Sequence, residues 1–219
     1  MTAVDPARRP AAAVTASGRA RTLTVEAPVG RPTAHWGMYL LVATEATFFA
    51  CLLAAYFYIQ FTHGGPWPPA GIEKPKLAKP LIMVATLLVS SVTMVWAGRA
   101  VRRGGRGSML LALVITIILG LFFLAVEASD LKEKAAEEFT WSTNAYGSLY
   151  FVISGFDSLH VISGLIMLGW LVVAGALGKF TSGRHERVAT VSIYWQFIVV
   201  LWLVIVFCLH VSPHFSDWF

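Results

Sequence analysis

The chain has 219 residues, of which 57% are apolar and 13% are charged. A soluble domain carries about 25% charged residues, so this composition excludes an ordinary water-soluble globular protein. The apolar residues come in runs of about twenty, which is the length that a helix needs to cross a bilayer. We therefore predict an all-α, polytopic membrane protein. Its net charge is +5. In a membrane protein an excess of basic residues mostly reflects the orientation of the spans and is weak evidence for nucleic-acid binding.

The first 34 residues are rich in Ala, Pro, Thr and Arg, and we predict a disordered cytoplasmic tail. The pair Arg8-Arg9 is not followed by the apolar region and cleavage site of a twin-arginine signal, although the composition is also typical of a transit peptide. Residues 35–219 are expected to form one five-helix transmembrane domain. Its spans are predicted at about 36–61, 80–98, 108–126, 148–177 and 189–211.

The basic residues divide unevenly between the two sides of the predicted domain. Twelve of the 17 lie in the tail or in the links after the second and fourth spans, and every arginine is among them. By the positive-inside rule the N-terminus is cytoplasmic and the C-terminus lies on the outer, periplasmic or extracellular side. In an organelle the same rule would place the N-terminus in the matrix.

Three polar residues stand out inside the predicted spans: Glu45, Asp157 and His160. A charged side chain at a helix centre in lipid costs about 2.5–3.5 kcal/mol on insertion scales, so such groups are usually paired. Glu45 and His160 lie at similar depths, and we predict that they pair. The alternative is that backbone, serine or water satisfies each separately. Asp157 shares a helix face with His160, three residues away.

The remaining residues give no sign of redox or transport chemistry. A haem between helices usually needs two histidines at matching depth, but of six histidines only His160 lies well inside a predicted span. Cys51 and Cys208 are interpreted as small residues of the membrane core. A transporter usually shows an internal repeat, and none is visible. We therefore predict that this chain binds no cofactor or metal and supports a larger complex.

Several short motifs between about residues 36 and 211 resemble those of a known protein family. The chain resembles subunit III of the haem-copper oxygen reductases (cytochrome c oxidase), in its short five-span bacterial form. The motifs are Trp36-Gly37, Thr44-Glu45 with Phe48-Phe49, Trp67-Pro68-Pro69, Leu88 to Thr93, Gly120-Leu121-Phe122-Phe123, Tyr146-Gly147-Ser148, Gly155-Phe156, Leu159-His160-Val161, Gly164, and Tyr194-Trp195 with Phe197 and Trp202.

The resemblance implies a fold and a set of partners. The first two spans would form one group and the remaining three another, separated by a cleft that holds structural phospholipid. The chain would pack against catalytic subunit I, with subunit II and other oxidase subunits nearby, and the haem and copper would belong to those partners. It would support proton uptake, with Glu45 as the family's buried carboxylate and His160 as its histidine. Membership of a respiratory supercomplex stays open, as does the electron donor.

Several positions depart from the family pattern. Asp157 stands where a histidine is usual, and Gln196 and Val199 replace a histidine and an aspartate. Glu127 and Asp130 stand where a glutamine and a glutamate are usual. These differences keep open a divergent branch, as the partner of a quinol oxidase or of nitric oxide reductase. An independent transporter or membrane scaffold is the third hypothesis.

Aromatic and basic residues near the predicted span ends are candidates for contacts with lipid headgroups or partner subunits. The alternative for each tryptophan is an ordinary interfacial belt. A nearby arginine would meet a lipid phosphate. The candidates are Trp36, Trp67, Trp96, Trp195, Arg99 and Arg102. A stripe of small residues, Ala46, Ala50 and Ala54, further predicts that the first span packs closely against another helix.

Overall fold

A computed structural model describes residues 33–62, 64, 67–69, 72, 74–137, 139–180 and 185–215, all of them within one compact unit, Arg31–Phe219. The predicted tail thus lies almost entirely outside the described residues. All regular secondary structure in the described part is helical: α1 (Thr33–Thr62), α2 (Ala78–Arg102), α3 (Arg106–Ala136), α4 (Ala145–Ala176), α5 (Glu186–Ile205), the π-helical η1 (Val206–Val211) and the short η2 (Ser212–His214).

Five of these helices are long and apolar enough to cross a membrane, which confirms the predicted all-α, five-span fold. The third helix is longer than predicted, because it continues from residue 126 through the acidic segment to Ala136. At about 1.5 Å per residue it is longer than the hydrocarbon core is thick, so its charged end can reach water. Lys134 pairs with Asp130 one turn earlier and supports this extension.

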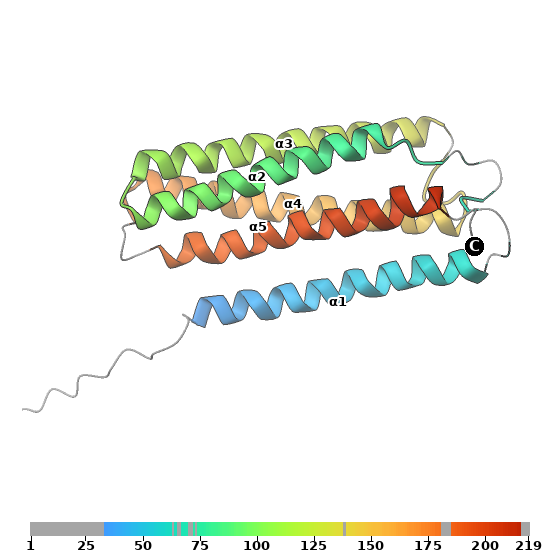
Figure 1. The fold of residues 1–219 in the computed structure, drawn as a ribbon, viewed down its shortest axis with the longest axis horizontal. Coiled ribbons are helices and arrows are strands. Elements are labelled where there is room, and N and C mark those ends of the chain that lie inside the picture. The colour runs from blue at the N-terminus through green and yellow to red at the C-terminus, as the bar shows by residue number, and fades with distance from the viewer. Residues whose placement is uncertain are drawn as a thin grey trace, which may run out of the picture. The chain divides into compact units, whose positions relative to one another are not determined.

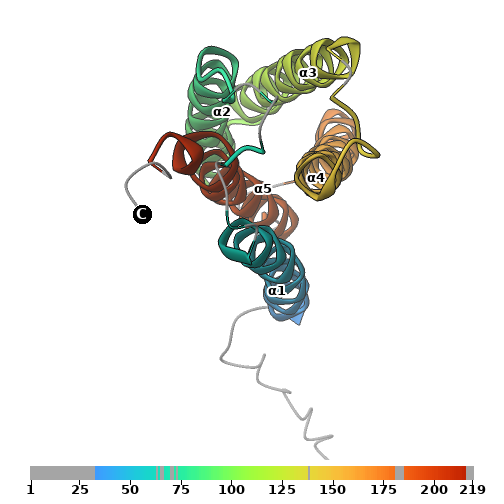
Figure 2. The same cartoon turned by 90° about the vertical axis from the view of Figure 1, so that its right-hand side faces the viewer.

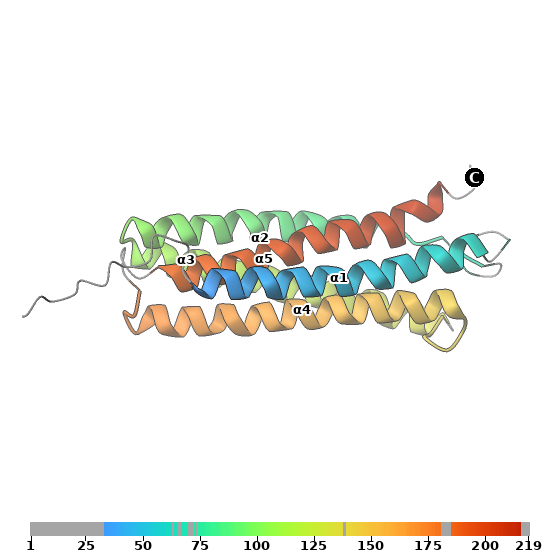
Figure 3. The same cartoon turned by 90° about the horizontal axis from the view of Figure 1, so that it is seen from below.

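The helices do not divide into the first two against the other three. Helix α2 runs antiparallel to α3 after a three-residue link and also packs against α5, while α4 packs against α3 and α5. Helix α1 has its main contacts with α5 and α4 rather than with α2. Figure 2 shows α1 outside the group formed by α2 to α5, and Figure 1 and Figure 3 show it running along α5 and α4. The expected two-plus-three grouping is therefore wrong.

The link between α2 and α3 explains their close pairing. Gly104 adopts φ +74° there, a left-handed conformation that glycine takes without the steric penalty of a Cβ. The chain then reverses between Arg102 and Arg106. Along the hairpin, the hydroxyls of Thr93 and Thr116 lie 2.8 Å apart and tie the two helices together inside the domain. The small polar residues thus act as an interhelical bond in an apolar interior.

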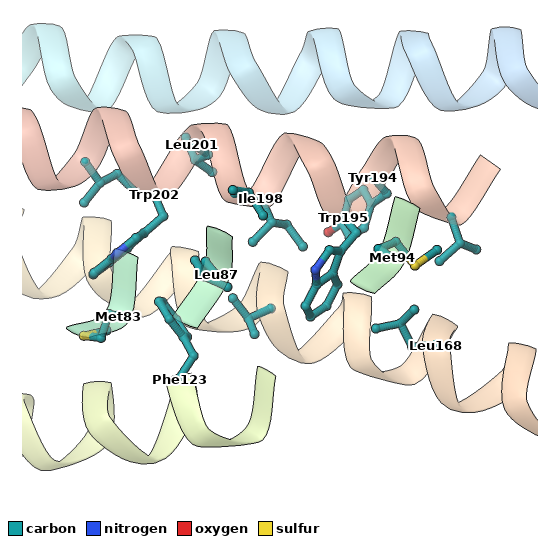
Figure 4. Packing of buried hydrophobic residues seen from close by; sticks show 14 of the residues in the cluster. Met83, Leu87, Met94, Phe123, Leu168, Tyr194, Trp195, Ile198, Leu201 and Trp202 are labelled. Carbon is teal, nitrogen blue, oxygen red and sulfur yellow. The ribbon is translucent and has the colours of Figure 1, made fainter. Parts of the chain in front are cut away.

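Trp195 of α5 lies at the centre of the core and is fully buried (Figure 4). Its indole Nε1 donates a hydrogen bond to Ser90 Oγ of α2 at 3.0 Å. Its ring lies against Gly120 of α3 and Gly164 of α4, where an added Cβ would come within 2.9 Å of it. This one side chain thereby touches all four helices of the group. Its predicted place at a lipid or subunit interface is wrong, because Ser90 supplies the acceptor that the indole needs inside the protein.

Candidate functional site

Glu45 of α1 and His160 of α4 meet across the boundary between α1 and the rest of the domain. Glu45 Oε2 lies 3.1 Å from His160 Nε2, so the predicted contact is present. The side chain of His160 is 11% exposed and that of Glu45 is 32% exposed. Glu45 therefore lies at the edge of the protein rather than in its core, and the imidazole is the more deeply placed partner.

The other contacts of His160 fix the orientation of its ring. His160 Nδ1 lies 2.7 Å from the carbonyl oxygen of Phe156, and a carbonyl accepts a hydrogen bond only from a protonated nitrogen. Nε2 is then left to face Glu45, either as an acceptor from the carboxylic acid or as a donor to the carboxylate. Phe49 contacts the ring edge-on, with the ring centroids 5.1 Å apart.

A groove of about 410 Å³ opens beside this pair. On its polar side, Tyr194 Oη of α5 lies 2.6 Å from Ser163 Oγ, and the Tyr194 and His160 rings are stacked with centroids 6.4 Å apart. The groove thus combines four hydrogen-bonding side chains with an apolar wall, on a surface where three helices meet. Its lining residues are Glu45, Phe48, Phe156, Leu159, His160, Ser163 and Tyr194.

The third predicted polar residue, Asp157, does not join this contact. It is completely buried, and neither of its carboxyl oxygens has a hydrogen-bond partner among the described residues. Glu127 of α3 contacts the next residue of α4, Ser158. The structure therefore brings Glu45 and His160 together and places Asp157 on the α3 side of the same helix.

The predicted interface residues separate into two groups. Trp36 and Trp96 are exposed, at 59% and 39%, and Arg99 and Arg102 are exposed in the last turn of α2. These four side chains are exposed at the surface of the chain, so their predicted contact with lipid or a partner subunit stays a prediction. Trp67, by contrast, is 3% exposed. Its predicted interfacial position is wrong, because its Nε1 donates to Tyr56 Oη at 2.9 Å inside an aromatic cluster.

A second polar group lies among α3, α4 and η1, and the sequence did not predict it as a unit. Ser158 Oγ donates to Glu127 Oε2 at 2.6 Å. One turn along α3, Asp130 Oδ2 accepts from Tyr150 Oη at 3.3 Å, and the same hydroxyl lies 3.1 Å from His210 Nε2. The spacing of Glu127 and Asp130 at i and i+3 is the sequence signal for this group, once the helix is known to extend past residue 126.

Span five also carries a polar contact that the family pattern did not supply. Gln196 accepts a hydrogen bond from Ser91 Oγ at 2.6 Å and donates one to the Ser91 carbonyl at 3.2 Å. Both bonds join α5 to α2. In the described ranges, no three His, Cys, Asp or Glu side chains gather in a way that would hold a metal ion.

Comparison with known proteins places this architecture in a family. The family described as cytochrome c oxidase subunit III matches residues 20–212. Cytochrome c oxidase subunit 3 of Ornithorhynchus anatinus is 38% identical over 174 residues, and that of Homo sapiens is 37% identical over 174 residues, each covering 77% of this chain and 66% of the relative. The protein of that name from Oryctolagus cuniculus is 35% identical over 181 residues, or 80% of this chain and 68% of the relative.

The chain spans about 66% of the length of the first two of these relatives. The match nevertheless includes all five membrane helices and both members of the α1–α4 pair. A family match over most of the chain and a five-helix membrane fold lead to the same conclusion. The chain belongs to the cytochrome c oxidase subunit III family.

Proposed function

We propose that the chain is the non-catalytic subunit III of an oxygen-reducing haem-copper terminal oxidase in aerobic respiration. It stabilises catalytic subunit I, binds structural phospholipid and supports proton uptake, while the haem and copper belong to partner subunits. The observation that carries this proposal is the family match over residues 20–212. The basic residues favour a cytoplasmic N-terminus in a bacterial plasma membrane.

The exposed side of α1 supports packing against a partner helix. The small residues Ala46, Ala50 and Ala54 are all exposed, so the close packing predicted for this stripe does not occur among the described helices. Small residues allow two helix backbones to approach closely in a membrane. We assign this face of α1 to subunit I, with subunit II and the other oxidase subunits farther away.

The lipid-binding role is supported by two features at different depths. The groove beside Glu45 has apolar walls formed by Phe48, Phe156 and Leu159, which suit an acyl chain. Trp96 and Arg99 are exposed near the end of α2, where an indole and a guanidinium suit a phospholipid headgroup. In this proposal the lipid lies against the surface where α1, α4 and α5 meet.

The Glu45–His160 pair supports the proton-related role. Its carboxyl oxygen and imidazole nitrogen lie 3.1 Å apart, and the hydroxyls of Ser163 and Tyr194 line the same groove. Such groups accept and donate protons without the help of a metal. We propose that the pair takes part in proton delivery to subunit I.

Purification tests the proposal. The chain should co-purify with haem and copper subunits that reduce oxygen. If it instead runs alone, the oxidase assignment fails, and a companion that reduces nitric oxide would favour the alternative branch. Oxidation of quinol by the purified complex would identify the quinol-oxidase form.

Variants of the pair test its role within that complex. His160→Ala and Glu45→Gln should each lower retention of this subunit or shorten the active lifetime during turnover, with haem spectra unchanged. Glu137→Gln, at an exposed residue of the α3–α4 connection, is the matched control. Loss of the haem signal in an assembled His160→Ala complex would contradict the non-catalytic role.

A further inference from the structure

A second pair of carboxyl groups lies deeper in the domain than Glu45. Glu127 of α3 is 3% exposed and Asp157 of α4 is 0% exposed. Ser158, the residue that follows Asp157 on α4, donates a hydrogen bond from its hydroxyl to Glu127 Oε2 at 2.6 Å. The Glu127 carboxyl is thereby fixed against α4 beside Asp157.

The hydrogen bonds of this pair leave most of its oxygens unpartnered. Glu127 Oε1, Asp157 Oδ1 and Asp157 Oδ2 have no hydrogen-bond partner among the described residues. The ion pairs found in the same part of the chain are Lys79–Glu133, Lys134–Asp130 and His160–Glu45, so none involves these two acids. Two ionised carboxylates buried together without a cation are strongly disfavoured. A carboxyl and a carboxylate that share a proton avoid that cost.

We propose that Glu127 and Asp157 form a proton-binding site inside the membrane domain, whose ligand is one exchangeable proton. The site is separate from the Glu45–His160 pair. It does not rest on the proposed function, because a proton can bind here whatever complex contains the chain.

Exchange requires a path to water, and α3 supplies one. Asp130 and Lys134 follow Glu127 at i+3 and i+7, so these side chains line one face of the helix toward its C-terminal end. Asp130 and Lys134 also line a cavity of about 760 Å³ at that end, together with the lysines at 74, 76 and 79 and the glutamates at 133 and 137. The acids thus lead from the buried pair to a polar cavity.

The other titratable groups around the pair come from α4, α5 and η1. Tyr150 of α4 contacts both Asp130 and His210, and Lys134 Nζ lies 5.2 Å from the centroid of its ring. On the α5 side, the titratable group is Tyr194, which lines the groove beside His160. Lys134 is engaged by Asp130, so it does not neutralise Glu127. The network offers hydroxyl and imidazole groups that can pass a proton between Asp130 and the interior.

Infrared difference spectroscopy on the full chain with its co-purifying partners tests the site. A pH step should change the C=O stretching band of a protonated carboxyl, and the band should shift in D₂O because the proton exchanges. Glu127→Gln and Asp157→Asn should each abolish this pH-dependent band, and Asp157→Glu should retain it. Glu186→Gln, at an exposed residue in the first turn of α5, is the control that should leave it in place.

Two results would overturn the proposal. One is a pH-dependent band that persists at full amplitude in both Glu127→Gln and Asp157→Asn. The other is a band that is lost in these variants but neither responds to pH nor shifts in D₂O, since the pair would then hold a fixed structural proton. If the Asp157→Asn protein is not produced in a folded form, the infrared band of Glu127→Gln still tests the same carboxyl pair. Because the band needs no oxygen reduction, its failure is distinguishable from failure of the oxidase assignment.

Discussion

The packing of Trp195 against α4 makes Gly164 a sensitive glycine to test. A Cβ at Gly164 would lie 2.9 and 3.0 Å from Trp195 ring carbons and 3.1 Å from Ile198 Cδ1. The ring cannot easily retreat, because Gly120 of α3 lies against it and Ser90 holds its Nε1. Overpacking of this kind costs about 1–3 kcal/mol, against about 1 kcal/mol that alanine gains over glycine in a helix.

Gly155→Ala in the same helix is the matched control, since its added Cβ meets nothing within 4 Å. Gly155→Ala should leave the free energy of unfolding unchanged or raise it by up to about 1 kcal/mol. Gly164→Ala should be less stable than Gly155→Ala by about 1–3 kcal/mol. Denaturant unfolding of the detergent-solubilised protein, followed by tryptophan fluorescence, measures both. Equal stability of the two variants would refute the tight contact between α4 and the Trp195 ring.

Three further predictions follow from the contacts. Ser90→Ala should lower the free energy of unfolding by about 1–3 kcal/mol, because the buried Trp195 N–H loses its acceptor; an unchanged unfolding curve would contradict this. In a double-mutant cycle, Glu45 and His160 should show a coupling energy of about 0.5–3 kcal/mol, whereas strict additivity would mean that their contact contributes nothing. A lipid-soluble carbodiimide should modify Glu45, which opens to a groove, before Glu127, as read by peptide mass spectrometry; the reverse order would refute this difference in accessibility.

The number and type of helices could be predicted from the sequence, because a helix that crosses a bilayer needs about twenty mostly apolar residues and hydropathy detects such runs. It could not predict which faces pack, since lipid and protein interiors are equally apolar. Ala46 therefore suggested a packed face but is exposed, and Trp195 suggested an interface but is fully buried. The length of α3 was also missed. The low hydropathy of its acidic end predicts a loop outside the membrane. Residues such as Lys134 and Ala136 nevertheless have a high helix propensity in water.

The Glu45–His160 contact could be predicted because two costly groups at similar depth in an apolar medium favour one another. The contact between Glu127 and Ser158 could not. Glu127 stands at the end of the predicted span, where a charge needs no partner, and only the longer helix places it in the interior. The separation of Asp157 from His160 follows from the helical arrangement around α4, which no spacing rule along one helix specifies.

The π-helical turn at the end of α5 makes the contact between α5 and α4 depend on chain length. A π-turn holds one residue more than the corresponding α-turn, and η1 carries His210 to the hydroxyl of Tyr150. If the same residues instead formed an uninterrupted α-helix, with none deleted, the residues at the end of the segment would be rotated by about 100°. His210 would then turn away from Tyr150 although every side chain is retained. The register of this segment, rather than its composition, thus sets where the imidazole lies.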